Sequence, residues 1–434
     1  MAKLDLKIDL SVLKKINFGA LKAFSAMIWP LVIVLAGVIV LTAAILMGRS
    51  FKSKVQRESI PLETQVKTMM GTATPAAQVQ IEKQYEDAYQ LDANEIEKLA
   101  MESTQRELIS YDIFPQPKDT SALIFNAYGK KFREKIEQLA ASIKGSDCPS
   151  EDEVKSLIEK GSGAGSYSSR MGSAEQEKIK DEFFNARAKG ISVYVNPADV
   201  AGYIFWGDYQ YTNIEKGTID CWKWQLGCWI AEDVFKTVDK MNKGSIGIVN
   251  APVKRIEKIG FATPDKLYTT GQNSKMDQSP PKYIIKPEDQ LTESYTARVS
   301  TDDINVVQFS IVMVLDTQAV LPFMQELCSE KEHKWRGYKG NEEEKTFKHN
   351  QITILESRIK PVDNTMEDHK KYRYGSNAVS EVELICEYIF YKKGYEQINP
   401  EMYKKPEPKP AEGADGGAPG GPGGPPGFGP GGRP

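Results

Sequence analysis

The feature that most constrains the structure of this chain is an uninterrupted apolar segment near its N-terminus. No charged residue occurs between Lys22 and Arg49, and residues 27–47 are mainly Ile, Leu, Val and Ala. A helix of about 20 such residues crosses the ~30 Å hydrocarbon core of a bilayer. A cleaved signal peptide usually has a shorter apolar run, of roughly 7–15 residues. We therefore expect a transmembrane helix over residues 23–48, after an N-terminal lead over residues 1–22.

Charge does not decide the orientation of this helix. Lysines are spread over the lead, and Arg49, Lys52, Lys54 and Arg57 follow the apolar segment closely. Close to the membrane this bias favours a cytoplasmic position for the chain that follows, but long domains translocate largely regardless of charge. The whole chain carries 56 Lys and Arg against 59 Asp and Glu, a net charge of −3, which excludes a generally basic nucleic-acid binder. Its negative mean hydropathy excludes a multi-span transporter.

Residues 49–115 carry apolar side chains at three-, four- and seven-residue spacings, which predicts a helical stalk or weak coiled coil. We expect Pro61 to begin a new helix and residues 71–75 to form a turn. Strict heptads are not sustained, because Asp92 falls on the stripe, so the stalk could pack on its own domain or pair with another chain. The candidate interface residues are Val55, Leu62, Val66, Ile81, Tyr85, Ile96 and Leu99.

A first α+β domain is predicted over residues 116–268. Helices are expected from a cap at Asp119 or Thr120, after Ser150, over 174–188 and from a cap at Asp220. A short strand is expected at 191–195, and a strand with outward-pointing charges at 253–262. The glycine-rich residues 161–169 are interpreted as a linker, since no strand precedes them and no Gly-Lys-Ser/Thr follows. The helix from Asp220 contains Trp222, Trp224 and Trp229, which we interpret as core residues, with an aromatic ligand pocket as the alternative.

A second domain is predicted over residues 294–395, after a linker over 269–293. Residues 306–315 alternate as a strand, a helix containing Pro322 follows, and residues 329–348 are expected to form a loop. Strands follow at 351–359 and 382–390, and Glu381, Glu383 and Glu387 alternate with apolar residues, which predicts a sheet with one solvated face. The Gly/Pro-rich residues 396–434 are expected to be a disordered tail. The predicted fold class is thus α+β, with one transmembrane helix, a helical stalk and two ferredoxin-like (βαββ-type) domains.

The sequence carries no recognisable reaction centre. It lacks Walker, G-x-S-x-G and Cys-x-x-Cys motifs, and His333, His349 and His369 lie in polar segments without metal-ligand spacing. Cys221 and Cys228 would lie ~10 Å apart along a helix, beyond the ~7 Å that a disulfide spans. We therefore predict no catalytic residue, cofactor or metal, and a protein that is not an enzyme.

Three segments resemble the PilO family of type IV pilus alignment proteins and the similar GspM proteins of type II secretion. They are FSIVMVLDTQAVLPFMQEL at 309–327, ITILESRI at 352–359 and VELICEYIF at 382–390, a strand, helix, strand, strand succession. The enlarged first domain, the tryptophan-rich helix and the tail are similar to a divergent, planctomycete- or verrucomicrobial-type branch.

This resemblance implies a non-catalytic scaffold in the bacterial inner membrane, with a cytoplasmic N-terminus and a periplasmic body. It also implies self-association and pairing with a PilN-like membrane protein and other pilus or secretion components. It would link the inner-membrane platform to periplasmic and outer-membrane parts. Two other hypotheses remain open, namely a membrane-tethered periplasmic sensor or ligand-binding module that uses the aromatic region, and an anchored hydrolase with converging carboxylates.

Overall fold

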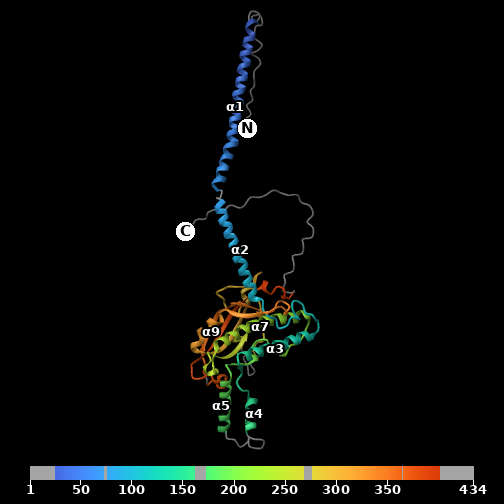
Figure 1. Cartoon of the computed structure of the whole chain (residues 1–434), viewed down its shortest axis with the longest axis vertical. Coiled ribbons are helices and arrows are strands. Elements are labelled where there is room, and N and C mark those ends of the chain that lie inside the picture. Colours follow the sequence, from blue (N-terminus) through green and yellow to red (C-terminus); the bar gives the residue numbers. More distant parts are fainter. Residues whose placement is uncertain (1–24, 73–75, 162–172, 268–275, 364, 401–434) are drawn as a thin grey trace. The chain divides into compact units, whose positions relative to one another are not determined.

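The computed structural model describes residues 25–72, 76–161, 173–267, 276–363 and 365–400 (Figure 1). The chain forms two compact units, Met1–Asp92 and Ala93–Pro434. The predicted lead over 1–22, the glycine-rich residues 162–169 and the tail beyond residue 400 lie outside the described ranges. Residues 396–400, which we assigned to the tail, include the buried Ile398 and so belong to the folded body.

The first unit contains α1 (Ser25–Thr72) and the beginning of α2 (Ala76–Thr104). By length and composition, α1 could cross a membrane. The prediction that Pro61 begins a new helix is wrong, because α1 continues through it. Because Pro61 has no backbone N–H, the carbonyl of Arg57 lacks its usual helical hydrogen bond. Arg57 is exposed, so water can bond to this carbonyl instead.

A six-stranded mixed sheet forms the centre of the second unit. Its order is β1 (Gly145–Ser146), β2 (Val193–Val195), β3 (Val253–Gly260), β4 (Ile304–Asp316), β8 (Val379–Tyr391) and β7 (Ile352–Pro361). The first two pairings are parallel and the other three antiparallel. The predicted α+β class is confirmed at this level. Both predicted segments, 116–268 and 294–395, contribute to this one sheet, since β3 pairs along β4.

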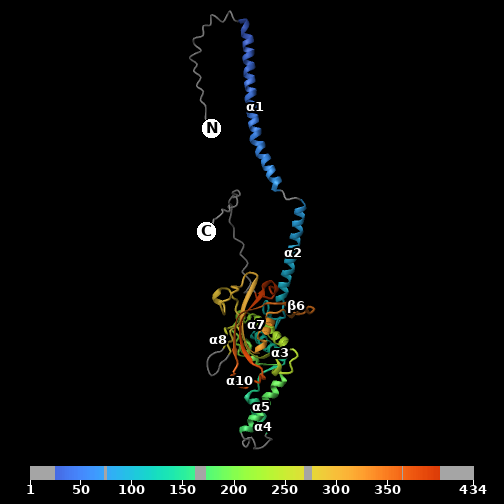
Figure 2. The same ribbon diagram turned by 90° about the vertical axis from the view of Figure 1, so that its left-hand side faces the viewer.

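Helices gather beside the sheet, and in Figure 2 α8 lies on one side of the unit while α3 and β6 lie on the other. The α-helices of this unit, besides the end of α2, are α3 (Ala122–Ser142), α4 (Glu151–Gly161), α5 (Ser173–Gly190), α6 (Tyr203–Gly207), α7 (Ile214–Asn242), α8 (Pro264–Leu267), α9 (Val320–Leu327) and α10 (Glu367–Lys370). The 3₁₀ helices are η3 (Pro197–Asp199), η4 (Ile248–Asn250), η5 (Pro287–Asp289), η6 (Thr317–Ala319) and η7 (Lys392–Gly394).

Two predicted helix starts differ from the structure. The α7 helix begins after Asn213, whose Oδ1 accepts a hydrogen bond of 2.8 Å from the backbone N–H of Lys216. Asp220 therefore lies inside the helix, where it pairs with Lys216 at 2.9 Å. The α3 helix is preceded by Ser121 rather than by Asp119 or Thr120. Asn and Asp cap helices about equally well, so the sequence alone does not show whether Asn213 or Asp220 begins α7.

The predicted solvated sheet faces are wrong. Glu383 and Glu387 on β8 are buried, and so are Lys254, Glu257 and Lys258 on β3. On β3, Lys254 donates to the carbonyl of Ile248, Lys258 donates to the carbonyl of Leu267, and Glu257 pairs with Arg255. On β8, Glu387 is covered by residues of the segment 276–300, most of which we assigned to a linker. Arg298 Nη1 lies 2.8 Å from Glu387 Oε1, and the hydroxyl of Thr296 donates to Glu387 Oε2 at 3.0 Å. Each buried charge thus has a specific partner.

The predicted loop over 329–348 contains a hairpin instead. Its strands are β5 (Lys331–Trp335) and β6 (Lys345–His349), which form a separate two-stranded sheet. Along β5 the residues alternate between buried and exposed, with Lys331, His333 and Trp335 buried. This hairpin supplies both histidines of the candidate site, His333 and His349.

Candidate functional site

A cavity of about 610 Å³ opens on the second unit, between the chain that follows α2, helices α3 and α7, and the β5–β6 hairpin. Its wall carries five cationic and four anionic side chains, so it does not select a ligand of one charge. The lining residues are Arg106, Glu107, Leu108, Ile109, Lys131, Glu134, Lys135, Gln138, Gln225, Cys228, Trp229, Glu232, Lys236, Glu332, His333, Lys334 and Thr346.

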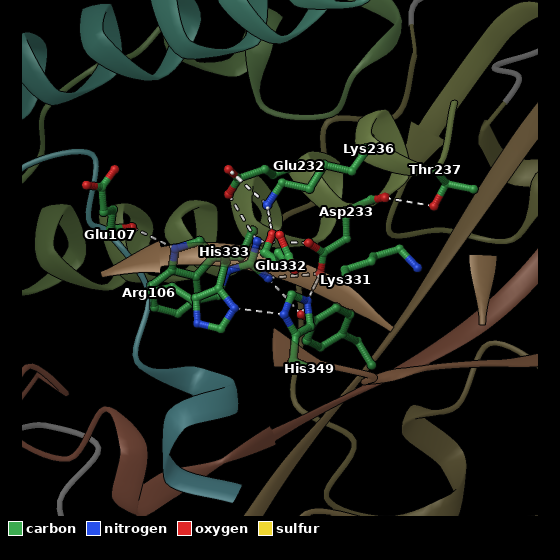
Figure 3. Close-up of polar contacts among 12 residues, drawn as sticks. Arg106, Glu107, Glu232, Asp233, Lys236, Thr237, Lys331, Glu332, His333 and His349 are labelled. Atoms are coloured by element: carbon green, nitrogen blue, oxygen red, sulfur yellow. Dashed lines mark hydrogen bonds and ion pairs between the residues drawn. The ribbon is translucent and has the colours of Figure 1, made fainter. Parts of the chain in front are cut away.

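A buried ion network lies against this cavity, centred on Arg106 and Asp233 (Figure 3). The two side chains form a bidentate pair, with Arg106 Nη1 2.9 Å from Asp233 Oδ2 and Nη2 2.9 Å from Oδ1. Arg106 also donates to Glu232 Oε2 at 3.0 Å and to the hydroxyl of Tyr388 at 2.8 Å. Such planar, two-point pairing is the strongest arrangement available to an arginine and a carboxylate.

Two histidines extend the network from Asp233 to the end of α2. His349 Nε2 lies 2.7 Å from Asp233 Oδ2, and its Nδ1 lies 2.8 Å from Nδ1 of His333. His333 Nε2 faces two backbone carbonyl oxygens, of Glu102 at 3.2 Å and Gln105 at 3.1 Å. Figure 3 shows the two rings meeting between the hairpin and α7. All four ring nitrogens therefore face protein atoms.

The electrostatics of the network follow from burial and from these pairs. Burial alone would raise the pKa of Asp233, but the charge of Arg106 and the hydrogen bonds from His349 and Arg106 outweigh it and hold that pKa well below its usual range. Burial is also the main cause that lowers the pKa of His333 to about 3, and Arg106 acts in the same direction. Burial lowers the pKa of His349 as well, against the opposing effect of Asp233. At neutral pH, Arg106 and Asp233 are charged and the two rings are neutral.

Further hydrogen bonds attach the end of α2 and the chain after it to the body. Thr104 Oγ1 donates to the carbonyl of Tyr391 at 2.8 Å, Trp229 Nε1 donates to the carbonyl of Glu107 at 2.8 Å, and the N–H of Ile109 donates to Gln225 Oε1 at 2.9 Å. Together with His333 on β5, partners from α7 and β8 thus hold several residues between 102 and 109. The end of α2 and the chain after it (the junction) are therefore packed onto the body.

A second cluster brings Glu257, His369 and Glu381 together from β3, α10 and β8, with one potential metal-ligand atom from each within 4.8 Å of the others. The spacing of these three residues along the sequence does not indicate that they lie close together. Arg255 lies 2.8 Å from Glu257, and Lys360 lies 3.7 Å from Glu381. Since each carboxylate has a protein cation beside it, we interpret the cluster as ion pairs around His369.

The residues predicted as sites lie as follows. The seven candidate stalk residues are all exposed, from 47% for Val55 and Val66 to 66% for Ile96. Trp222, Trp224 and Trp229 are buried in α7, and of these only Trp229 borders the cavity. The core interpretation of the three tryptophans is therefore the one that the structure favours. The five cysteines are free thiols.

Sequence reasoning missed the ion network. Arg106, Asp233, His333 and His349 belong to four separate stretches of the chain, and no motif links them. One signal was present, because the period-two alternation of residues 331–335 indicates a strand that buries His333.

Comparisons with known proteins add little. No family model and no curated protein matches the chain. Among solved structures, a crystal structure of a protein from Akkermansia muciniphila matches 72% of this chain and 97% of its own, with 7% identity and a TM-score of 0.27. A TM-score of that size does not indicate a shared fold, so nothing about fold or function follows from this match.

Proposed function

We propose that the protein is a non-catalytic, membrane-anchored scaffold of a type IV pilus or type II secretion-like envelope machine, similar to PilO. Its helix α1 would cross the inner membrane, with the N-terminus in the cytoplasm and the body in the periplasm. The observation that carries this proposal is the packing of the end of α2 onto the body, where α7, β5 and β8 hold it through hydrogen bonds. A body that positions its partners needs the end of its stalk helix attached to it in this way, which a flexible linker would not provide.

The chemistry of the cavity supports a structural role. A histidine that acts as a general base must present a ring nitrogen to its substrate. Both nitrogens of His333 and both of His349 already face protein atoms at 2.7–3.2 Å. Asp233 has Arg106, Tyr388 and His349 as partners and no exposed surface. These groups can stabilise the junction, and the ring nitrogens of His333, the one of them that borders the cavity, are both directed at protein atoms.

The topology supports a ferredoxin-like assignment for part of the body. Two α-β-β units, α7-β3-β4 and α9-β7-β8, place four antiparallel strands in the order β3-β4-β8-β7. Helices α7 and α9 contact each other. A permuted ferredoxin-like fold has this arrangement, with a strand from each unit at the centre. We propose one such unit, made jointly by the two predicted segments, with the β5–β6 hairpin inserted after α9.

The exposed stalk residues support pairing with another chain. Leu62 is 61% exposed on α1 and Ile96 is 66% exposed on α2, and other large apolar side chains accompany them along both helices. A row of exposed apolar residues on a helix marks an interaction surface, and a partner helix would cover it. We propose that a second copy or a PilN-like protein does so.

The test uses the full chain in detergent and in native membranes. Leu62→Asp combined with Ile96→Asp should weaken self-association in analytical ultracentrifugation, while Gln65→Asp with Gln90→Asp, at exposed polar positions, should not. Affinity purification from membranes should recover identified pilus or secretion components with the wild type. A monomeric wild type that recovers no such component would refute the proposal.

A further inference from the structure

Another cavity, of about 420 Å³, opens between α6, the start of α7 and residues 276–278. Phe205, Tyr209 and Met276 contribute apolar surface to its lining, and Asp208 and Asp220 contribute carboxylates. Sites for small molecules in proteins are concave, have volumes of roughly 300–1,000 Å³, and combine an apolar lining with a few polar groups. The size and the lining of this cavity are those of a small-molecule site.

The aromatic part of the lining is held in place by the surrounding structure. Gln278 Oε1 accepts hydrogen bonds from the backbone N–H of Gly202 at 3.0 Å and of Phe205 at 3.2 Å, which attaches the start of α6 to residues 276–278. The ring of Phe205 lies 5.4 Å from the ring of the fully buried Trp224 and 5.6 Å from the ring of Tyr209. The cavity therefore exists before any ligand binds.

One carboxylate of the lining is buried and only partly satisfied. Asp220 is 5% exposed, and its Oδ2 lies 2.9 Å from Nζ of Lys216. Its other oxygen, Oδ1, has no hydrogen-bond partner among the described residues, yet it is not sealed off from the cavity. A buried acceptor without a donor is unfavourable, so Oδ1 provides a site for a donor from a ligand. The carboxylate of Asp208 is exposed at the same cavity, and within the described part of the chain it also lacks a partner.

The charges of the lining select a cation. Two carboxylates, of Asp208 and Asp220, face one ammonium group, of Lys216. Lys223 lies near Asp220 but does not line the cavity. Burial raises the pKa of Tyr209, so its hydroxyl stays neutral and its ring adds no charge. An anion would meet two carboxylates, and a neutral apolar molecule would leave Asp220 Oδ1 without a donor, whereas aromatic rings and carboxylates both attract a cation.

We propose that this cavity binds a small organic cation, an ammonium or guanidinium group joined to an apolar stem, with the charged group on Asp220 and Asp208 and the stem against Phe205 and Tyr209. Binding forms and breaks no covalent bond. The site goes beyond the scaffold role and does not depend on it, because its lining includes no residue of α1, α2 or the Arg106–Asp233 network. It also differs from a pocket made by Trp222, Trp224 and Trp229, since none of these three lines it.

Three isosteric probes separate the charge of the ligand from its apolar stem, namely benzylamine, benzyl alcohol and benzoate. We would titrate each into the full chain in detergent with ¹³C-methyl-labelled methionine, and assign Met276 with the variant Met276→Leu. At neutral pH benzylamine should shift the Met276 signal saturably, with a dissociation constant in the millimolar range or below. Benzyl alcohol should bind at least about tenfold more weakly, benzoate should not bind, and added salt should weaken the binding of benzylamine.

Variants at the two carboxylates locate the cation. Asp220→Asn should weaken benzylamine binding about tenfold, and Asp208→Asn, at an exposed position, about threefold. The matched control Asp239→Asn changes an exposed aspartate of α7 outside the cavity and should bind as the wild type does. Because Asp208 is exposed and has no partner among the described residues, Asp208→Asn tests the site even if Asp220→Asn does not fold.

Two results would overturn the proposal. One is equal binding of benzylamine and benzyl alcohol by the wild type, and the other is unchanged benzylamine binding in both carboxylate variants. N-acetyl-lysine methylamide carries the same cation on a peptide backbone, so its affinity relative to benzylamine distinguishes a side chain of a partner protein from a free amine. Self-association through the stalk should be the same in all of these variants, so failure of this site and failure of the scaffold role are separate outcomes.

Discussion

Replacing Arg106 by methionine tests whether the ion network holds the junction together. Arg106 is 2% exposed and Asp233 is fully buried, and the substitution leaves the carboxylate of Asp233 with only Tyr388 and His349 as partners. Removing one member of a buried pair costs about 3–5 kcal/mol, because the remaining charge stays out of water. Methionine keeps the length and apolar stem of the side chain, so little of this loss comes from a cavity.

The assay is urea unfolding of the full chain in detergent, followed by tryptophan fluorescence. Trp229 reports on the site, since the guanidinium carbon of Arg106 lies 6.0 Å from its ring. The control is Arg373→Met, which breaks a partly exposed pair with Asp181 at 2.7 Å and should cost about 1 kcal/mol or less. The double variant Arg106→Met, Asp233→Asn should recover part of the loss, because it removes the unpaired charge. An Arg106→Met variant as stable as the control would refute the reasoning.

Two further predictions concern the sheet and its surroundings. Leu384→Asp places a charge at a fully buried position of β8 and should abolish cooperative unfolding of the body, whereas retained cooperative melting would show that the position can reach water. Burial raises the pKa of Asp199 to about 7, against the effect of Arg255. Since this folded-state pKa lies above the unfolded value of 3.8, the contribution of Asp199 to stability is complete below about pH 4 and is lost as the pH rises through 7. Asp199→Asn should remove this loss, at most about 3 kcal/mol between pH 5 and pH 8, and an unchanged difference in urea unfolding between these two pH values would contradict it.

A helix or strand is predicted well from the sequence where the signal, such as alternation of apolar and polar residues, lies within that one element. The alternation in β4 and β8 and the helix start after Ser150 are local signals, and all three elements are found. Pro322 lies in the first turn of α9, as a helix start delayed by proline requires. Polar alternation on β3 and β8, however, does not mean that a face meets water. On β8, the segment 276–300 has few apolar residues and yet covers Glu387 through Thr296 and Arg298. On β3, Lys254 and Lys258 are held by backbone carbonyls of Ile248 and Leu267.

The candidate site could not be predicted for a related physical reason. Arginine, aspartate and histidine are read as surface residues in isolation, because burying any one of them alone is costly. Their burial becomes favourable only when all are brought together, and that depends on pairing between α7, the hairpin and the chain after α2. The information is therefore in the tertiary arrangement and not in any local pattern.

The network also explains why the hairpin, inserted between α9 and β7, matters to the rest of the body. Its two strands pair only with each other, so the central sheet does not hold them in place. The hairpin is fixed instead through side chains, among them His349 on Asp233 of α7 and His333 on the carbonyls that end α2. A two-stranded hairpin alone is marginally stable in water. The hairpin and the end of α2 therefore stabilise each other, and any change in the protonation of the two histidines acts on both.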